Sequence, residues 1–253
     1  MRLYQRILTE NDCYRQNRFM IPMGVMVHST GADNPRLSRY VAPDDGLLGR
    51  PSSRHWNQRG LDACVHAFIG RLADGSIASY QTLPWTMRGW HCGGRGNGTH
   101  IGFEICEDGL DDPAYFRQVY REAVELTAHL CGMFRLDPLA DGVVLCHAEG
   151  HRRGIASNHA DVLHWFTRFG VDMDDFRRDV AREMRGSGGN MTYEEWVSCL
   201  ERYRREQGKK PASMPGLLGE AEKMELTDGS RPRDFATREE CAVMARKAAL
   251  FRG

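Results

Sequence analysis

Five apolar segments of strand length constrain the fold of this chain more than any other feature of its sequence. They are residues 23–28, 65–70, 77–82, 101–106 and 142–147. Short apolar runs bounded by turn-forming residues are typical of strands buried in a sheet. The second and third runs flank Asp74-Gly75, a dipeptide that predicts a β-hairpin. The first two thirds of the chain therefore fold around a β-sheet.

Two amphipathic segments predict helices that cover this sheet. Asp112 and Pro113 have the residue types of an N-cap and a first helical turn, and apolar residues then recur at helical spacing as far as Leu130. Residues 172–185 predict a second helix. Strands that alternate with helices and a hairpin indicate an α/β fold with a mixed central sheet covered by helices.

A change in composition after residue 185 indicates a second unit. The glycine-rich segment GSGGN lies within residues 186–191 and predicts a linker between a domain over 1–185 and a small module over 192–253. The module is mainly helical by pattern, and Thr237 with Glu240 predicts a capping box. It is too short for a large core, so we expect an accessory role.

Charge and hydropathy exclude several classes of protein. The chain has 34 Lys and Arg against 34 Asp and Glu, so no net field attracts nucleic acid. No segment reaches the roughly 18 apolar residues that span a bilayer. Residues 1–18 mix charges and lack the apolar core of a signal peptide. We therefore expect synthesis in the cytoplasm, without a signal peptide, membrane insertion or a nucleic-acid partner.

The eight cysteines are expected to be reduced thiols, because export from the cytoplasm is not indicated. No two of them form a C-x-x-C pair, which argues against a thiolate zinc finger. Cys106 and Cys146 lie inside apolar runs and are expected to be small core residues.

Two of the predicted strands end in a histidine, His28 and His147. Either residue alone is explained by an ordinary surface histidine, but two strand-end imidazoles together favour a metal centre. Zinc binds imidazole nitrogen and carboxylate oxygen in a tetrahedral set, and a catalytic site leaves one position for water. Spacing leaves the third ligand open between His151, His159 and Asp161.

Glu104 lies inside the fourth apolar strand. A charge there is costly unless it is paired or faces a cleft, and a carboxylate beside a metal-bound water is the usual base of zinc hydrolases. A structural ion pair is the alternative. The glycine-rich loop before this strand contains Trp90 and His91, which suit a groove wall that contacts a sugar or a peptide, or else an aromatic plug at the sheet edge.

Taken together, these motifs resemble a known family. The segments MVHST, WHCGGRGNGTHIGFEIC, LCH and SNHAD are similar to the type 2 N-acetylmuramoyl-L-alanine amidases over roughly residues 20–180. That family includes bacteriophage endolysins and is related to peptidoglycan recognition proteins. CVHAFIG, YQTLPW and GIASNHADVLHWF resemble endolysins of phages or prophages of Gram-positive hosts. The resemblance implies a zinc hydrolase that cuts the amide bond between N-acetylmuramic acid and L-alanine in peptidoglycan.

The resemblance also implies roles for particular residues. The implied ligands of Zn²⁺ are His28, His147 and Asp161. Glu104 would be the base, and His159 would stabilise the oxyanion. The interval between His147 and Asp161 is longer than in compact members of the family, which keeps His159 open as the third ligand. The residues expected to contact substrate are Thr30, Trp90 and His91.

The C-terminal segment LTDGSRPRDFATREECAVMARKA resembles the closing half of a surface-layer-homology repeat. This implies that the module binds cell-wall polymer or pairs with a second copy in a homodimer. An enzyme made in the cytoplasm would then reach the wall on release during phage lysis. The alternatives are a non-catalytic peptidoglycan-binding module, a cytoplasmic amidase that recycles muropeptides, and a zinc peptidase, although the sequence has no H-E-x-x-H motif.

Overall fold

The computed structural model describes residues 1–187, 219 and 221–223. The chain divides by its internal contacts into two units, Met1–Gly188 and Gly189–Gly253, and the sheet and its helices belong to the first. Apart from residues 219 and 221–223, the predicted module over 192–253 lies outside the described residues, as does most of the predicted linker. Within the described residues, no helix has the length and apolarity needed to cross a bilayer.

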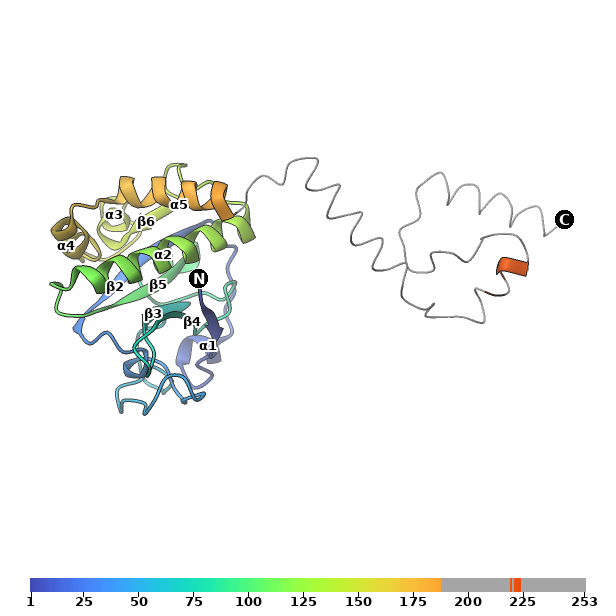
Figure 1. The fold of residues 1–253 in the computed structure, drawn as a ribbon, viewed down its shortest axis with the longest axis horizontal. Coiled ribbons are helices and arrows are strands. Elements are labelled where there is room, and N and C mark those ends of the chain that lie inside the picture. The colour runs from blue at the N-terminus through green and yellow to red at the C-terminus, as the bar shows by residue number, and fades with distance from the viewer. Residues whose placement is uncertain (188–218, 220, 224–253) are drawn as a thin grey trace. The chain divides into compact units, whose positions relative to one another are not determined.

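A six-stranded mixed sheet forms the centre of the first unit (Figure 1). In spatial order its strands are β1 (Leu3–Gln5), β4 (Ile77–Gln81), β3 (Ala67–Arg71), β5 (His100–Glu107), β2 (Gly24–Asp33) and β6 (Val144–Cys146). Of the pairs of neighbouring strands, β3 and β4 are antiparallel and form the predicted hairpin, whereas the others are parallel. The strands β3, β5, β2 and β6 therefore bring their carboxyl ends to one edge of the sheet.

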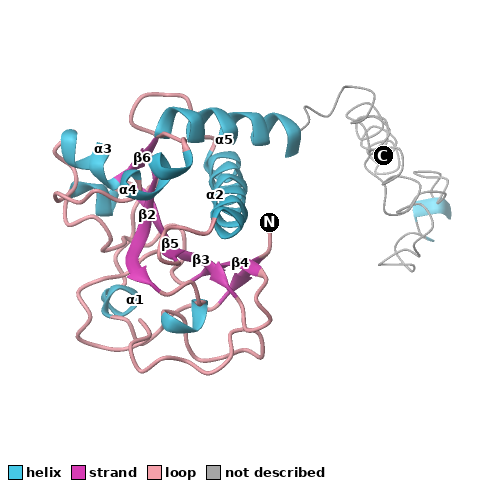
Figure 2. Cartoon of the chain, turned by 60° about the vertical axis from the view of Figure 1, so that its left-hand side comes forward, coloured by secondary structure: helices cyan, strands magenta, loops and turns pink. Residues whose placement is uncertain are grey.

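Two long helices cover one face of the sheet (Figure 2). Helix α2 (Pro113–Phe134) begins as predicted, because the Asp112 carboxylate accepts hydrogen bonds from the backbone N–H groups of Ala114 and Tyr115. Helix α5 (Met173–Ser187) packs beside it. The shorter helices are α1 (Asp12–Gln16), α3 (His147–Arg152) and α4 (Leu163–Phe166), with 3-10 turns at Leu37–Arg39, Arg95–Gly98 and Thr167–Phe169.

Alternation along the strands decides which residues face these helices. Val27 and Phe103 belong to the core beneath α2 and α5. His28 and Glu104, which are aligned with each other across β2 and β5, therefore point to the opposite face. Phe68 is aligned with Glu104 from β3 and belongs to the second core on that side.

Three local structures differ from the sequence prediction. Residues 29–35 predict a turn, but β2 continues to Asp33 because it pairs with β5 beyond Ser29. Gly150 predicts an irregular segment, yet it lies inside α3, where a side-chain carbon would come within 2.8 Å of Met26 Cε. The short elements β1 and α1 have no periodic pattern and were not predicted.

The cysteines are not all reduced, which corrects the expectation from the sequence. Cys13 in α1 and Cys64, just before β3, form a disulfide. Cys106 and Cys146 are buried free thiols, as predicted. Two cysteines 51 residues apart are paired by the tertiary fold, which their spacing in the sequence does not reveal.

Reduction of this disulfide is expected to lower the free energy of unfolding by about 2–4 kcal/mol. The cross-link spans 51 residues, so it restricts the unfolded chain strongly. Thermal unfolding with and without a reductant measures the effect. A Cys13→Ser, Cys64→Ser chain should match the reduced parent and lose its response to the reductant. An unfolding midpoint that reduction leaves unchanged would contradict the prediction.

Candidate metal centre

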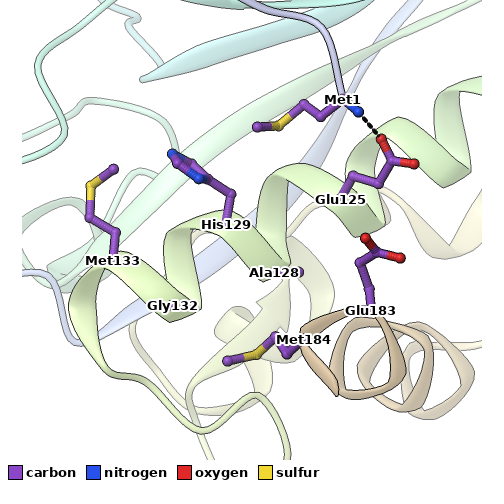
Figure 3. A pocket seen from close by; sticks show the side chains of 8 residues that line it. All are labelled: Met1, Glu125, Ala128, His129, Gly132, Met133, Glu183 and Met184. Carbon is purple, nitrogen blue, oxygen red and sulfur yellow. Dashed lines mark ion pairs between the residues drawn. The ribbon is translucent and has the colours of Figure 1, made fainter. Parts of the chain in front are cut away.

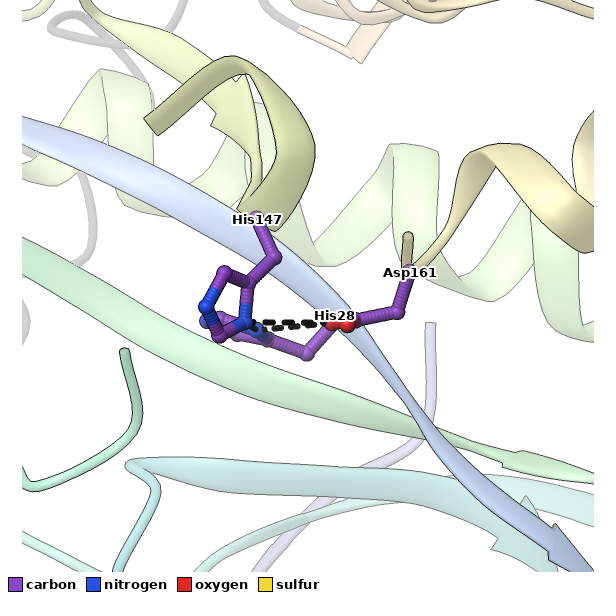
Figure 4. A group of neighbouring side chains, drawn as sticks. All are labelled: His28, His147 and Asp161. Carbon is purple, nitrogen blue, oxygen red and sulfur yellow. Dashed lines mark hydrogen bonds and ion pairs between the residues drawn. The ribbon is translucent and has the colours of Figure 1, made fainter. Parts of the chain in front are cut away.

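Three side chains from separate parts of the chain converge at the carboxyl edge of the sheet (Figure 4). His28 comes from β2, His147 begins α3, and Asp161 precedes α4. Nδ1 of His28 lies 3.1 Å from Nδ1 of His147 and 3.0 Å from Oδ2 of Asp161, and the third distance is 3.5 Å. Four-coordinate zinc with bonds of about 2.0–2.1 Å places its ligand atoms about 3.3 Å apart. The three residues therefore fit a zinc ion.

Burial and hydrogen bonding set the charges of this group. Burial lowers the pKa of His28, and the nearby Asp161 offsets part of that effect. Burial also opposes ionisation of Asp161, but its close contacts with His147 and His28 outweigh that effect and hold the pKa of the carboxyl well below its usual range. A neutral imidazole and an ionised carboxylate are the protonation states that bind a metal cation.

The three residues lie at an open pocket of about 490 Å³. The predicted site residues that line it are Thr30, Trp90, His91, Glu104, His147, His159 and Asp161. His28 is fully buried beneath them. His164 also lines the pocket and hydrogen-bonds Glu107 at 3.0 Å, a pair that the sequence analysis does not identify. The structure thus brings all of the predicted site residues to one place.

A second hollow, of about 700 Å³, lies along α2 and α5 on the helical side of the sheet (Figure 3). The amino group of Met1 forms an ion pair with Glu125 there, and Met184 lines the wall. Among the described residues, the group of His28, His147 and Asp161 is the one set of three or more potential ligands that could hold a metal ion. The first pocket is therefore the candidate site.

Glu104 faces this pocket from β5. Its Oε2 is buried and has no hydrogen-bonding partner in the described part of the chain. Burial, and then the charges of Asp161 and Glu107, raise the pKa of Glu104 well above its usual value. A metal ion nearby would lower this pKa again, because its positive charge favours the carboxylate. A buried carboxyl group of this kind in a pocket is typical of proton transfer.

The other two candidates for the third ligand lie outside the cluster. His159 is exposed and stacks on His147, with the ring centroids 4.7 Å apart. His151 is exposed on α3, and its Nδ1 lies 3.3 Å from the carbonyl oxygen of Ala156. The fold therefore places Asp161, rather than either histidine, against His28 and His147.

His66 is a buried histidine beside the site that the sequence analysis does not identify. The backbone N–H of Gly102 donates to its Nδ1 at 3.0 Å, and its Nε2 donates to the carbonyl oxygen of Met87 at 2.8 Å. The neutral ring thus joins Gly102 of β5 to Met87, which precedes the glycine-rich loop with Trp90 and His91. Burial lowers the pKa of His66 to about 4, although the hydrogen bond to the carbonyl oxygen of Met87 opposes the change.

Acid is expected to destabilise the fold through His66. The folded-state pKa of about 4 lies below the ordinary 6.5, so the unfolded chain binds the proton more readily. Stability is therefore lost as the pH falls from about 6.5 toward 4, by roughly 3 kcal/mol at about 1.4 kcal/mol per pKa unit. Urea unfolding between pH 7 and pH 4 measures this, and a His66→Gln chain should depend less on pH. Identical pH profiles for parent and variant would exclude this role.

The fold and the site define a class of protein. Two histidines and an aspartate gather at one edge of a mixed sheet, beside a glutamate whose buried Oε2 has no partner among the described residues. Such a set of groups is typical of metal-dependent hydrolases. The sequence model of the N-acetylmuramoyl-L-alanine amidases matches residues 18–162, more than half of the chain, and the chain belongs to this family. It is an amidase of peptidoglycan, acting on the bond between N-acetylmuramic acid and L-alanine.

Solved structures share the fold. The hydrolase AmiA of Staphylococcus aureus, solved with its ligand, has 17% sequence identity and a TM-score of 0.57, covering 75% of this chain and 86% of that chain. The PlyG catalytic domain has 17% identity and a TM-score of 0.51, covering 73% and 96%. At these identities the likeness establishes the fold alone, and the predicted mixed sheet covered by helices is confirmed. No curated protein matches the sequence.

Proposed function

We propose that this amidase depends on zinc and that His28, His147 and Asp161 hold the ion. The observation that carries the proposal is the convergence of two imidazole nitrogens and one carboxylate oxygen, 3.0–3.5 Å apart, at the edge of a substrate-sized pocket. Bound there, zinc would polarise the scissile carbonyl and lower the pKa of the attacking water.

Glu104 is the proposed general base. It would take a proton from the attacking water and pass it to the leaving amino group of L-alanine. The support is its position at the pocket, with an Oε2 atom that no other described group engages. His159, exposed above His147, would donate a hydrogen bond to the oxyanion of the tetrahedral intermediate. Thr30 and Trp90 would contact the glycan or the stem peptide.

We also propose that the enzyme acts on the polymeric cell wall as a phage or prophage endolysin. The segments similar to phage endolysins support this assignment. The Cys13–Cys64 disulfide supports this assignment independently, because disulfides persist outside the reducing cytosol. An amidase that recycles muropeptides would instead work inside the cytosol. A C-terminal module that binds the wall, or that pairs two copies of the chain, would raise the local concentration of the enzyme on an insoluble substrate.

Digestion of purified cell walls by the full chain tests these proposals. We expect new N-terminal alanine without new reducing sugar ends, as judged by mass spectrometry of the products. A chelator should stop the release, and added zinc should restore it.

Other outcomes would support the alternatives. Wall binding without new N-terminal alanine favours the non-catalytic module. Cleavage of soluble muropeptides but not of walls favours the recycling amidase. Digestion of casein without hydrolysis of walls favours a zinc peptidase.

A further inference from the structure

His28 has a hydrogen-bonded partner on the side of its ring that faces away from Asp161. Its Nε2 lies 2.9 Å from Nδ1 of His91, and Nε2 of His91 lies 3.1 Å from the carbonyl oxygen of His100. A carbonyl oxygen only accepts, so Nε2 of His91 carries a hydrogen. Nδ1 of a neutral His91 then accepts the hydrogen on Nε2 of His28. Nδ1 of His28, the atom that faces His147 and Asp161, is left with a free lone pair.

His147 has an equivalent partner in Ser157. Nε2 of His147 lies 3.1 Å from Oγ of Ser157, and this hydroxyl donates to the carbonyl oxygen of Cys92 at 3.2 Å. Because the hydroxyl hydrogen is used on Cys92, Oγ accepts the hydrogen on Nε2 of His147. Nδ1 of His147 is thus also free of hydrogen, and it faces His28.

The His91 ring packs against two glycines, Gly102 and Gly89, which leave room for it because they have no side chain. A side-chain carbon on Gly102, inside β5, would lie 2.4 Å from the His91 ring, and one on Gly89 would lie 2.8 Å from it. Such distances do not occur between packed side chains, so both positions need glycine while the ring is there. A glycine in the interior of a strand often marks a close approach of this kind. The space beside Gly102 and Gly89, called the slot below, therefore holds the His91 ring against His28.

We propose that His91 and Ser157 are positioning residues, which hold His28 and His147 in the tautomer whose Nδ1 binds the metal. The inference rests on the proposed zinc site and deepens it. Hydrogen bonds to the second nitrogen of a ligating histidine fix the orientation of its ring, and their loss typically weakens metal binding about 10–100-fold. The sequence predicts a substrate contact for His91. The structure engages both its ring nitrogens within the protein, although the residue also lines the pocket.

Zinc affinity, measured on the full chain by competition with a coloured chelator, tests the proposal. His91→Phe keeps a ring in the slot and removes both nitrogens, so affinity should fall about 10–100-fold. His91→Asn retains an acceptor close to the position of Nδ1 and should recover most of the loss. Ser157→Ala should weaken binding, and Ser157→Thr, which keeps the hydroxyl, should not. His151→Phe, on an exposed ring outside the pocket, is the matched control.

Nitrogen NMR of the imidazole rings in the metal-free chain gives a second readout, which a merely structural role would not move. In the parent, His28 and His147 should carry their hydrogen on Nε2. In His91→Phe, His28 should shift toward the form with hydrogen on Nδ1.

Equal zinc affinity and equal tautomers in parent, His91→Phe and Ser157→Ala would overturn the proposal. If His91→Phe does not fold, Ser157→Ala and His91→Asn decide the matter. A parent that binds no zinc would refute the proposed function instead, and the tautomers of its metal-free form would still test the positioning roles.

Discussion

His28→Ala is expected to abolish both zinc binding and the hydrolysis of cell walls. His28 is fully buried, and its Nδ1 would be the central ligand atom of the proposed site, 3.1 Å from Nδ1 of His147 and 3.0 Å from Oδ2 of Asp161. Alanine leaves two protein ligands, too few to fix a four-coordinate ion in place. Hydrolysis should then fall to the background of the assay. Elemental analysis counts the zinc bound to each chain, and the release of N-terminal alanine measures the activity.

Three further variants sharpen this experiment. His129→Ala removes an exposed histidine of α2, on the helical side of the sheet, and should keep the zinc content and activity of the parent. Asp161→Ala should lose zinc as His28→Ala does, whereas His159→Ala should keep zinc and lose rate. If His159→Ala loses zinc and Asp161→Ala keeps it, His159 is the third ligand. A folded His28→Ala chain that still binds one zinc ion would refute the metal centre.

The sequence alone predicts much of the sheet and part of the site because both depend on local patterns. Apolar runs locate β2, β3, β4, β5 and β6, and the Asp112-Pro113 pair locates the start of α2. Alternation along a strand also separates His28 and Glu104 from the apolar neighbours that face the helices. Two polar residues within apolar runs can therefore be recognised from the order of amino acids alone.

Features that depend on contacts between distant segments of the chain cannot be predicted from local sequence patterns. The position of the proposed third ligand depends on the path of the loop between α3 and α4, which brings Asp161 inward and leaves His159 exposed. The Cys13–Cys64 disulfide depends on where α1 packs. One signal in the sequence could have shown more: Gly102, inside an apolar strand, indicates a close approach, and the side chain that approaches is His91.

Glu104 lies on the strand next to the one that carries His28, so strand pairing fixes its position beside the proposed metal centre. It is aligned with His28 across β5 and β2. The structural ion pair considered for it finds no basic partner among the described residues. Burial and two nearby carboxylates raise its pKa, and a bound cation would lower the pKa again. Burial and a bound cation would therefore act on the pKa of Glu104 in opposite directions.

Glu104→Gln is expected to keep its zinc and to lose turnover by about 10²–10⁴-fold. Glutamine fills the same space but cannot accept the proton of the attacking water, so kcat should fall while the zinc content stays at that of the parent. Glu122→Gln is the matched control, because the buried Glu122 lies on α2, away from the pocket, and accepts a hydrogen bond from Ser79 at 2.8 Å. Its turnover should be unchanged. If Glu104→Gln turns over at nearly the rate of the parent, the metal centre stands but proton transfer must be assigned to another group.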